Sequence, residues 1–233
     1  MNKQKILSVL TYPTVVVVTL LAIIISFNRY YLNANVNNDS YYLLNGKVIF
    51  VDPGHGGHDN GTSWEEILED EINLSVAKKL YEKLVEFGAI AYISRNGDYD
   101  LASFYARNRK DEDMRKRVSY INSTSPDLFV SIHLNYFPNP NVSGAQVFYN
   151  RRNEKGKLLA NCLQDSLNDL NKKNKVAKSG DYYLTNNSIY PGVIVECGFI
   201  SNYQDRKKLT NENYQYTLVN KIIKGIINYL ELS

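Results

Sequence analysis

The chain has 233 residues, of which 44% are hydrophobic and 22% are charged, values typical of a globular protein. Its net charge is only +3, and the basic residues alternate with acidic ones, so the sequence argues against a nucleic-acid partner. With two cysteines, Cys162 and Cys197, a cysteine-rich zinc site is excluded, whereas a disulfide between them stays open.

The first segment, residues 6–27, carries no charged residue and is long enough to span a bilayer. Lys3 and Lys5 precede it, which favours an N-terminus that stays inside. No clear cleavage site follows, so a retained membrane anchor in residues 1–30 is favoured over a cleaved signal peptide, and a buried helix is the third alternative. Residues 31–45 are predicted as a linker and 46–233 as the catalytic domain, outside the cytoplasm.

Short apolar runs alternate with amphipathic segments through the rest of the chain. Strands are expected at 48–51, 89–94, 128–132, 146–149, 182–184 and 193–195. Helices are expected at 72–87, 114–121, 158–170 and 214–232, and the polar segment 95–113 is expected to be a long loop. This order predicts an α/β protein: one three-layer α/β/α domain with a mainly parallel twisted sheet flanked by helices.

Polar side chains follow several of these strands. His55 comes just after the first strand, on a turn that Pro53 and Gly54 begin, and His133 ends the third strand. Glu196 ends another strand, and Glu69 lies at the start of the first helix. The carboxyl ends of parallel strands share one edge, so these side chains can converge.

Two imidazoles and one carboxylate form the ligand set of many catalytic zinc sites, and a further carboxylate then acts as general base. Glu196 is the candidate for the base. For His55, the alternative to a metal ligand is an incidental surface histidine on a glycine-rich turn.

Four motifs carry a family resemblance: Val51–Gly57, Glu69 with Ile72–Leu74, Ser131–Asn135 and Val195–Asn202. Together they resemble the zinc-dependent N-acetylmuramoyl-L-alanine amidases of the Amidase_3 type, from about residue 47 to the C-terminus. Residues 115–122 and 143–146, with the short length and single apolar segment, are most similar to the spore-cortex, germination-specific branch.

The resemblance implies that His55, Glu69 and His133 bind one zinc ion and that Glu196 is the base. The usual Glu-Lys-Asp start of the helix motif is Glu69-Asp70-Glu71 here, so the ligand could also be Asp70 or Glu71. The register with Asn73 and Leu74 favours Glu69.

The implied reaction is hydrolysis of the amide between N-acetylmuramic acid and L-alanine of the peptidoglycan stem peptide. In spore cortex it would precede muramic lactam formation, which germination needs. The implied location is the extracytoplasmic face of a Gram-positive spore-forming bacterium, attached to the membrane through the N-terminal segment, with an activating protein as a further expected partner.

Arg117 and Asn135 are candidate substrate-binding residues that would hold charge developing on the carbonyl oxygen. For Arg117 the alternative is a surface ion pair with Asp113, and for Asn135 a turn residue. His58 is expected to be solvent-exposed rather than a ligand. Two other functions stay open: a catalytically silent cell-wall binding protein, and a zinc peptidase that cleaves another bond of the stem peptide.

Overall fold

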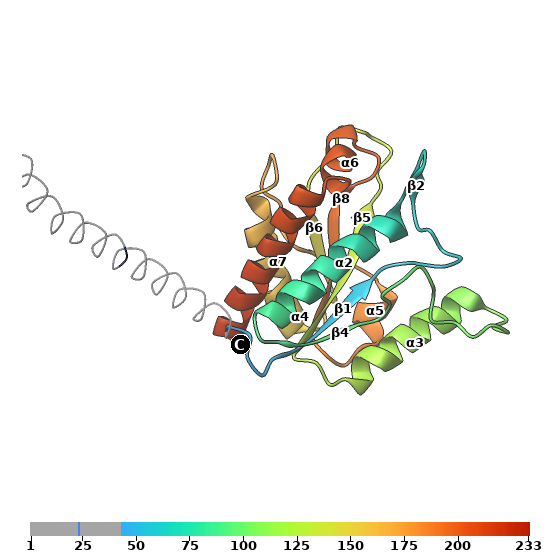
Figure 1. The fold of residues 1–233 in the computed structure, drawn as a ribbon, viewed down its shortest axis with the longest axis horizontal. Coiled ribbons are helices and arrows are strands. Elements are labelled where there is room, and N and C mark those ends of the chain that lie inside the picture. The colour runs from blue at the N-terminus through green and yellow to red at the C-terminus, as the bar shows by residue number, and fades with distance from the viewer. Residues whose placement is uncertain (1–22, 24–42) are drawn as a thin grey trace, which may run out of the picture. The chain divides into compact units, whose positions relative to one another are not determined.

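The computed structural model describes Ile23 and residues 43–233 (Figure 1). Apart from Ile23, the anchor expected in residues 1–30 lies outside the described residues, as does most of the expected linker. Within the described part, no helix combines the length and the apolar character that crossing a bilayer requires. Residues Leu44–Ser233 form one compact unit, described below.

A sheet of six strands lies at the centre of this unit, in the order β4-β1-β5-β8-β6-β7. Neighbouring strands are parallel, except that β6 runs antiparallel to β8. The strands are β1 (Val48–Pro53), β4 (Ile90–Ile93), β5 (Leu128–Asn135), β6 (Gln146–Tyr149), β7 (Lys178–Ser179) and β8 (Gly192–Phe199).

Helices cover both faces of the sheet (Figure 1). The larger core lies on the face covered by α2 (Glu69–Glu86), α4 (Glu154–Asn168) and α7 (Glu212–Leu232). On the opposite face, α3 (Arg109–Ser123) and α5 (Tyr183–Asn187) pack over a smaller apolar cluster. The predicted three-layer α/β/α architecture with a mainly parallel sheet is therefore confirmed.

The residues of β1 explain how one strand supports two layers. Ile49 and Val51 pack into the larger core, whereas Phe50 joins the smaller cluster with Phe129 and Ile121. Successive side chains of a strand point to opposite faces, so a strand covered on both sides is a continuous apolar run.

Two sequence predictions of secondary structure are wrong. Residues 182–184 do not form a strand, because Tyr183–Asn187 is the short helix α5, whose Leu184 packs beneath the sheet. The expected loop 95–113 ends early, since α3 already begins at Arg109. There the side chain of Asn108 accepts a hydrogen bond from the backbone N–H of Asp111, as a helix N-cap does.

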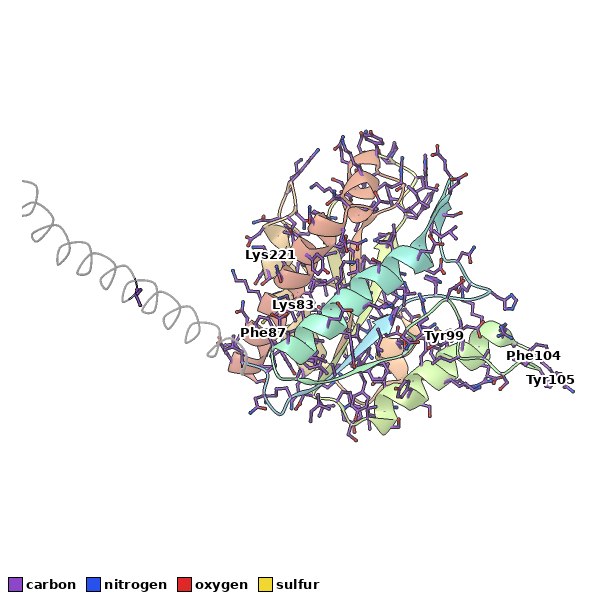
Figure 2. The ribbon with its side chains drawn as sticks, in the orientation of Figure 1. Lys83, Phe87, Tyr99, Phe104, Tyr105 and Lys221 are labelled. Carbon is purple, nitrogen blue, oxygen red and sulfur yellow. The ribbon has the colours of Figure 1, made fainter. Side chains whose placement is uncertain are left out.

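Four small elements had no predicted counterpart. The strands β2 (Ser63–Trp64) and β3 (Ile67–Leu68) form an antiparallel hairpin before α2, strand β7 pairs with β6, and helix α6 (Tyr203–Leu209) follows β8. The disulfide left open by the sequence is not formed, because Cys162 in α4 and Cys197 in β8 are both free thiols. The segment before α3 carries the strongly exposed rings of Phe104 and Tyr105 at its tip (Figure 2).

Candidate metal centre

The first strand leads into a turn with an unusual backbone. His55 has a φ of 61°, and the following Gly56 and Gly57 have φ values of 120° and 64°. Glycine adopts such angles freely, but a histidine does so only where its surroundings hold it. A backbone N–H of Gly56 bonded to the Asp59 carbonyl at 2.8 Å closes this turn. The result is an imidazole aimed back over the carboxyl end of β1.

Three side chains from distant parts of the chain meet at this edge of the sheet. The ligand atoms of His55, Glu69 and His133 all lie within 4.8 Å of one another. Glu69 Oε1 is 3.2 Å from His55 Nε2 and 3.2 Å from His133 Nδ1. Among the described residues, this is the group of histidine, cysteine and acidic side chains that could hold a metal ion.

Two glycines leave room for this cluster. A Cβ on Gly54 would lie 2.2 Å from Cε1 of His133, so any larger residue would displace that ring. A Cβ on Gly61 would lie 2.7 Å from Glu69 Oε2 and 2.8 Å from Cδ2 of His55. The glycine-rich turns of the sequence thus serve the packing of the cluster as well as the backbone angles.

Glu69 is the first residue of α2 and is only 2% exposed. Its carboxylate accepts hydrogen bonds from the backbone N–H groups of Thr62 and Leu134, at 2.8 and 3.1 Å. Burial disfavours its charged form, yet hydrogen bonds from His133 and His55 hold the pKa of Glu69 well below its usual range. The carboxylate is therefore charged, as a metal ligand must be.

The second ring nitrogen of His55 also has a partner. Asp59 Oδ2 lies 3.0 Å from His55 Nδ1, which leaves Nε2 directed at the cluster. Metal-binding histidines commonly use a carboxylate in this way to fix the ring. Two imidazoles and a charged carboxylate whose ligand atoms converge in this way are a donor set that fits a divalent cation.

Glu196 lies beside the cluster as the register partner of His133 on the adjacent strand β8. It is 7% exposed, and its Oε2 has no hydrogen-bond partner within the described part of the chain. Burial raises the pKa of Glu196 to about 7, although the charge of His133 acts in the opposite direction. A carboxyl group with such a pKa can both accept and release a proton near neutral pH.

Tyr182, the residue just before α5, lies within hydrogen-bond reach of Glu196. Burial, and then the negative charge of Glu196, raise the pKa of the Tyr182 hydroxyl, so it stays protonated. No sequence motif singled out this tyrosine, because residues 182–184 were expected to be a strand.

The position of Arg117 does not fit its expected contact with substrate. Its side chain is fully buried in α3 and forms ion pairs with Asp52 and Asp113, at 2.7 and 2.8 Å. The alternative, a surface ion pair with Asp113, names the correct partner of Arg117. It is wrong in placing the pair on the surface, because both residues are buried. The guanidinium lies behind the His55 turn and donates to the His55 carbonyl at 2.7 Å.

The other candidates take the following places. Asn135 is half-buried at the end of β5, next to the cluster in sequence, and its carbonyl accepts from the Ile200 N–H at 2.8 Å. His58 is exposed and does not belong to the cluster, as expected. Of the three consecutive acids at the start of α2, Glu69 joins the cluster, whereas Asp70 points elsewhere and Glu71 is exposed.

Sequence reasoning missed several supporting residues. Asp59 orients His55, and the Asn73 amide donates to Glu69 and to the Gly54 carbonyl, at 3.4 and 3.3 Å. Arg95 is 1% exposed and also bonds the turn. Only Asn73 carried a signal, because it lies one helical turn after Glu69 and so on the same face.

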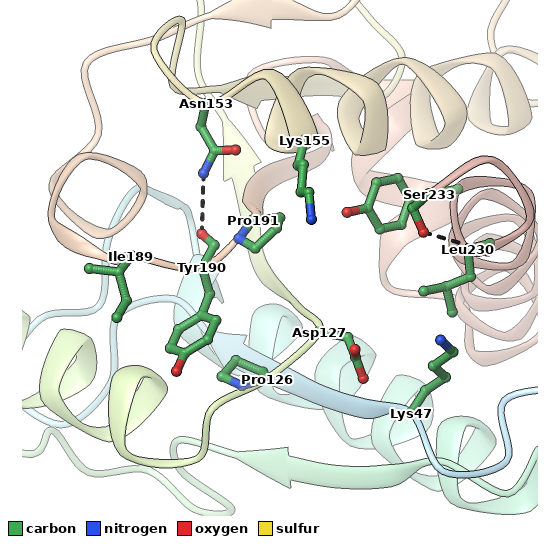
Figure 3. A pocket seen from close by; sticks show the side chains of 11 residues that line it. Lys47, Pro126, Asp127, Asn153, Lys155, Ile189, Tyr190, Pro191, Leu230 and Ser233 are labelled. Atoms are coloured by element: carbon green, nitrogen blue, oxygen red, sulfur yellow. Dashed lines mark hydrogen bonds between the residues drawn. The ribbon is translucent and has the colours of Figure 1, made fainter.

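A cavity of about 500 Å³ lies at the opposite edge of the sheet (Figure 3). Its lining includes Lys47, Asp127 and Pro191, which precede β1, β5 and β8. The metal-competent cluster therefore lies away from this cavity, at the carboxyl ends of the strands, where open α/β sheets usually bind their ligands.

Comparison with known proteins gives a consistent result. The sequence profile of the N-acetylmuramoyl-L-alanine amidase family, Amidase_3, matches residues 49–228. The chain belongs to this family. The amidase is 39% identical over 203 residues to the germination-specific N-acetylmuramoyl-L-alanine amidase of Bacillus subtilis (strain 168), covering 83% of this chain and 85% of that protein.

Solved structures agree with this assignment. The CwlD amidase from Clostridioides difficile, solved in complex with the GerS lipoprotein, is 34% identical. It superposes with a TM-score of 0.78 over 81% of this chain and 100% of that one. An N-acetylmuramoyl-L-alanine amidase from Clostridium difficile 630 matches with 30% identity and a TM-score of 0.71, covering 80% and 98%. The amidase described here is accordingly a hydrolase of this family.

Proposed function

We propose that this amidase uses one zinc ion, held by His55, Glu69 and His133, and that Glu196 is its catalytic base. The observation that carries the proposal is the convergence of the three ligand atoms within 4.8 Å, with the buried Glu196 paired to His133 on the adjacent strand. A bound zinc ion polarises a carbonyl and lowers the pKa of a water ligand to about 7.

Glu196 carries out the proposed proton transfers. A water molecule adds to the carbonyl carbon of the lactyl amide, and the Glu196 carboxylate takes its proton. The resulting carboxylic acid gives that proton to the amide nitrogen as the C–N bond breaks, which releases the amine of L-alanine and the lactyl carboxylic acid. The lactyl acid then loses the second proton of the water to the released amine or to solvent, which leaves a free lactyl carboxylate. The raised pKa of Glu196 suits both halves of this transfer at neutral pH. Asn135, at the end of β5, is the proposed donor to the carbonyl oxygen.

The biological setting is proposed from the relatives. A germination-specific amidase of Bacillus subtilis and the CwlD amidase of Clostridioides difficile are similar over most of this chain. We therefore propose that this amidase acts on spore-cortex peptidoglycan, where removal of the stem peptide permits muramic lactam formation. Its place would be the extracytoplasmic face of the membrane, with residues 1–30 as anchor, 31–45 as linker and 46–233 as catalytic domain.

A protein partner belongs to this proposal as well. The CwlD amidase was solved with the GerS lipoprotein bound, and a partner of that kind would activate this chain or complete its zinc binding. Purification with and without zinc, followed by metal analysis, would show whether the chain alone retains the ion.

The test combines metal analysis with mass spectrometry of digested peptidoglycan. Wild-type protein is expected to release stem peptides that begin with L-alanine. Glu196→Gln should keep zinc but lose at least about 100-fold in rate, because a general base is removed. His55→Ala should lose zinc and hydrolysis together. Full activity of Glu196→Gln, or products cut at another peptide bond, would contradict the proposal.

A further inference from the structure

Two arginines are buried directly behind the His55 turn. Arg95 and Arg117 are 1% and 0% exposed, and neither side chain can reach a substrate in the open site. Burying a guanidinium is costly unless its N–H groups are paired, so their partners indicate what they do. Those partners are mainly backbone carbonyls around the candidate metal ligands.

The two guanidinium groups bond three consecutive carbonyls of the turn. Arg117 donates to the carbonyls of Pro53 and His55, both at 2.7 Å. Arg95 donates to the carbonyls of Pro53 and Gly54, at 3.2 and 2.8 Å. These carbonyls follow the end of the strand, and buried carbonyls need donors. Fixing them fixes the peptide planes on both sides of His55, whose left-handed conformation would otherwise be unfavourable.

Arg95 also links the turn to a second ligand. Its Nη2 donates to the carbonyl of Asp70 at 2.9 Å, in the residue that follows Glu69. One guanidinium thus holds the backbone next to His55 and the backbone next to Glu69 at a set separation. Gly56 makes room for it, since a Cβ there would lie 2.7 Å from Arg95 Nε.

Arg117 is itself held firmly. Asp113 accepts from its Nε at 2.8 Å and Asp52 from its Nη1 at 2.7 Å. Asp52 is fixed in turn by the hydroxyls of Ser94 and Ser131, both at 2.6 Å. The Arg117 charge and these hydroxyls hold the pKa of Asp52 below its usual value despite its burial. The planar guanidinium presents its N–H donors in a fixed, forked geometry, and the two fixed carboxylates hold it in one orientation. A lysine ammonium group cannot reproduce this geometry.

We infer that Arg117 and Arg95 are positioning residues of the metal centre, which set the place of His55 and its separation from Glu69. This inference rests on the proposed zinc site and concerns how that site reaches its affinity. It predicts that the fork geometry, and not only the positive charge, determines how tightly the centre binds zinc.

The test is zinc affinity, measured by competition with a chromogenic chelator on purified protein. Arg117→Lys and Arg95→Lys keep the charge but lose the fork, so each is expected to weaken zinc binding 10- to 100-fold, as loss of groups that orient metal ligands typically does. Arg115→Lys is the matched control, because Arg115 lies in the same helix with its side chain 58% exposed and is expected to leave the affinity unchanged.

Two more variants separate the possible failures. His55→Ala must abolish tight zinc binding, and if it does not, the proposed centre itself is wrong. Asp113→Asn replaces the carboxylate that contacts Arg117 Nε with an amide of the same shape and leaves the contact between Arg117 and Asp52 in place. If Arg117→Lys shows no cooperative thermal unfolding, Asp113→Asn tests instead whether the position of Arg117 sets the zinc affinity. A weaker zinc affinity in Asp113→Asn supports the inference. Wild-type zinc affinity in the folded arginine variants, with a lowered melting temperature of the metal-free protein, would overturn it and leave a purely structural role.

Discussion

The central sheet carries a cavity at the amino ends of its parallel strands and the candidate metal centre at their carboxyl ends. At the amino ends of β1, β5 and β8 lies a cavity of about 500 Å³ (Figure 3), lined by side chains such as Lys47, Asp127 and Lys155. At the carboxyl ends lies a tight cluster in which Glu69 Oε1 is 3.2 Å from a ring nitrogen of both His55 and His133. The cavity is at one edge and the group of side chains that could hold a metal ion is at the other.

The two ends of the strands differ in how firmly neighbouring groups hold the polar side chains in place. At the carboxyl edge two proposed ligands are held by further groups. Two backbone N–H groups bond Glu69, Asp59 contacts the His55 ring, and Arg117 bonds the His55 carbonyl. At the amino edge, Asp127 accepts from the backbone N–H of Val48 at 2.8 Å and so supports the strand. Preorganised groups lower a reaction barrier, whereas an open cavity alone does not.

The largest effect is expected from removing a proposed metal ligand at the carboxyl edge. His133→Ala should lower hydrolysis of peptidoglycan by a factor on the order of 10³ or more, because several kcal/mol of metal assistance are lost. Lys155→Ala, at the amino edge, is the control and should keep wild-type activity. If the two variants lost similar amounts of activity, measured by peptide release, the proposal that catalysis takes place at the carboxyl edge would be contradicted.

The next effect concerns the pH dependence of stability in metal-free protein. Glu196 has a folded-state pKa of about 7, above the usual 4.5, so the folded state binds more protons than the unfolded state between these values. Its contribution to stability is full below pH 4.5 and is lost as the pH rises through 7, by about 3 kcal/mol in all.

Glu196→Gln cannot titrate and therefore isolates this contribution. Urea unfolding in chelator at pH 5 and pH 8 should show the wild type losing more stability than the variant as the pH rises. An equal change in both proteins would mean that the Glu196 carboxyl is not held in a desolvated place.

A smaller effect is expected from filling the space beside His133. Gly54→Ala would place a methyl group 2.2 Å from the ring, so the imidazole must move. A displacement of about 1 Å costs on the order of 100-fold in activity. Gly46→Ala is the comparison at the amino edge, where no atom lies within 4 Å of the added Cβ, although φ is +74°. It should cost some stability but no activity, and reduced peptide release from Gly46→Ala would contradict the account.

The smallest effect is expected at the amino edge itself. Asp127→Ala removes one hydrogen bond to the start of β1, worth about 1 kcal/mol in the free energy of unfolding. Activity at 25 °C should stay unchanged, since this end of the strand is remote from the cluster. Loss of activity without loss of stability would show that the cavity takes part in the reaction.

Sequence patterns sufficed for the parts of the fold that local chemistry determines. The apolar runs of β1, β5 and β8 and the polar residue after each run placed His55, His133 and Glu196 at one edge. The period of α2 placed Glu69 in reach of them. These features depend on the alternation of side chains in strands and on the order of elements, both of which can be read from one chain.

The remaining features depend on contacts between distant segments. Tyr182–Leu184 looks like a strand, but packing of Leu184 beneath the sheet makes this region helical. Arg117 lies in a segment rich in charge, and only the approach of Asp52, 65 positions away, shows that it is buried. Arg95 could not be identified for the same reason, since its partners Gly54 and Asp70 lie 41 and 25 positions away.

The most direct test of the central claim is anomalous X-ray diffraction at the zinc absorption edge, on crystals of the amidase grown with zinc. The account predicts one strong peak bound by His55, Glu69 and His133, with Glu196 beside it but not coordinating. A peak at other residues, or coordination by Glu196 in place of Glu69, would contradict it.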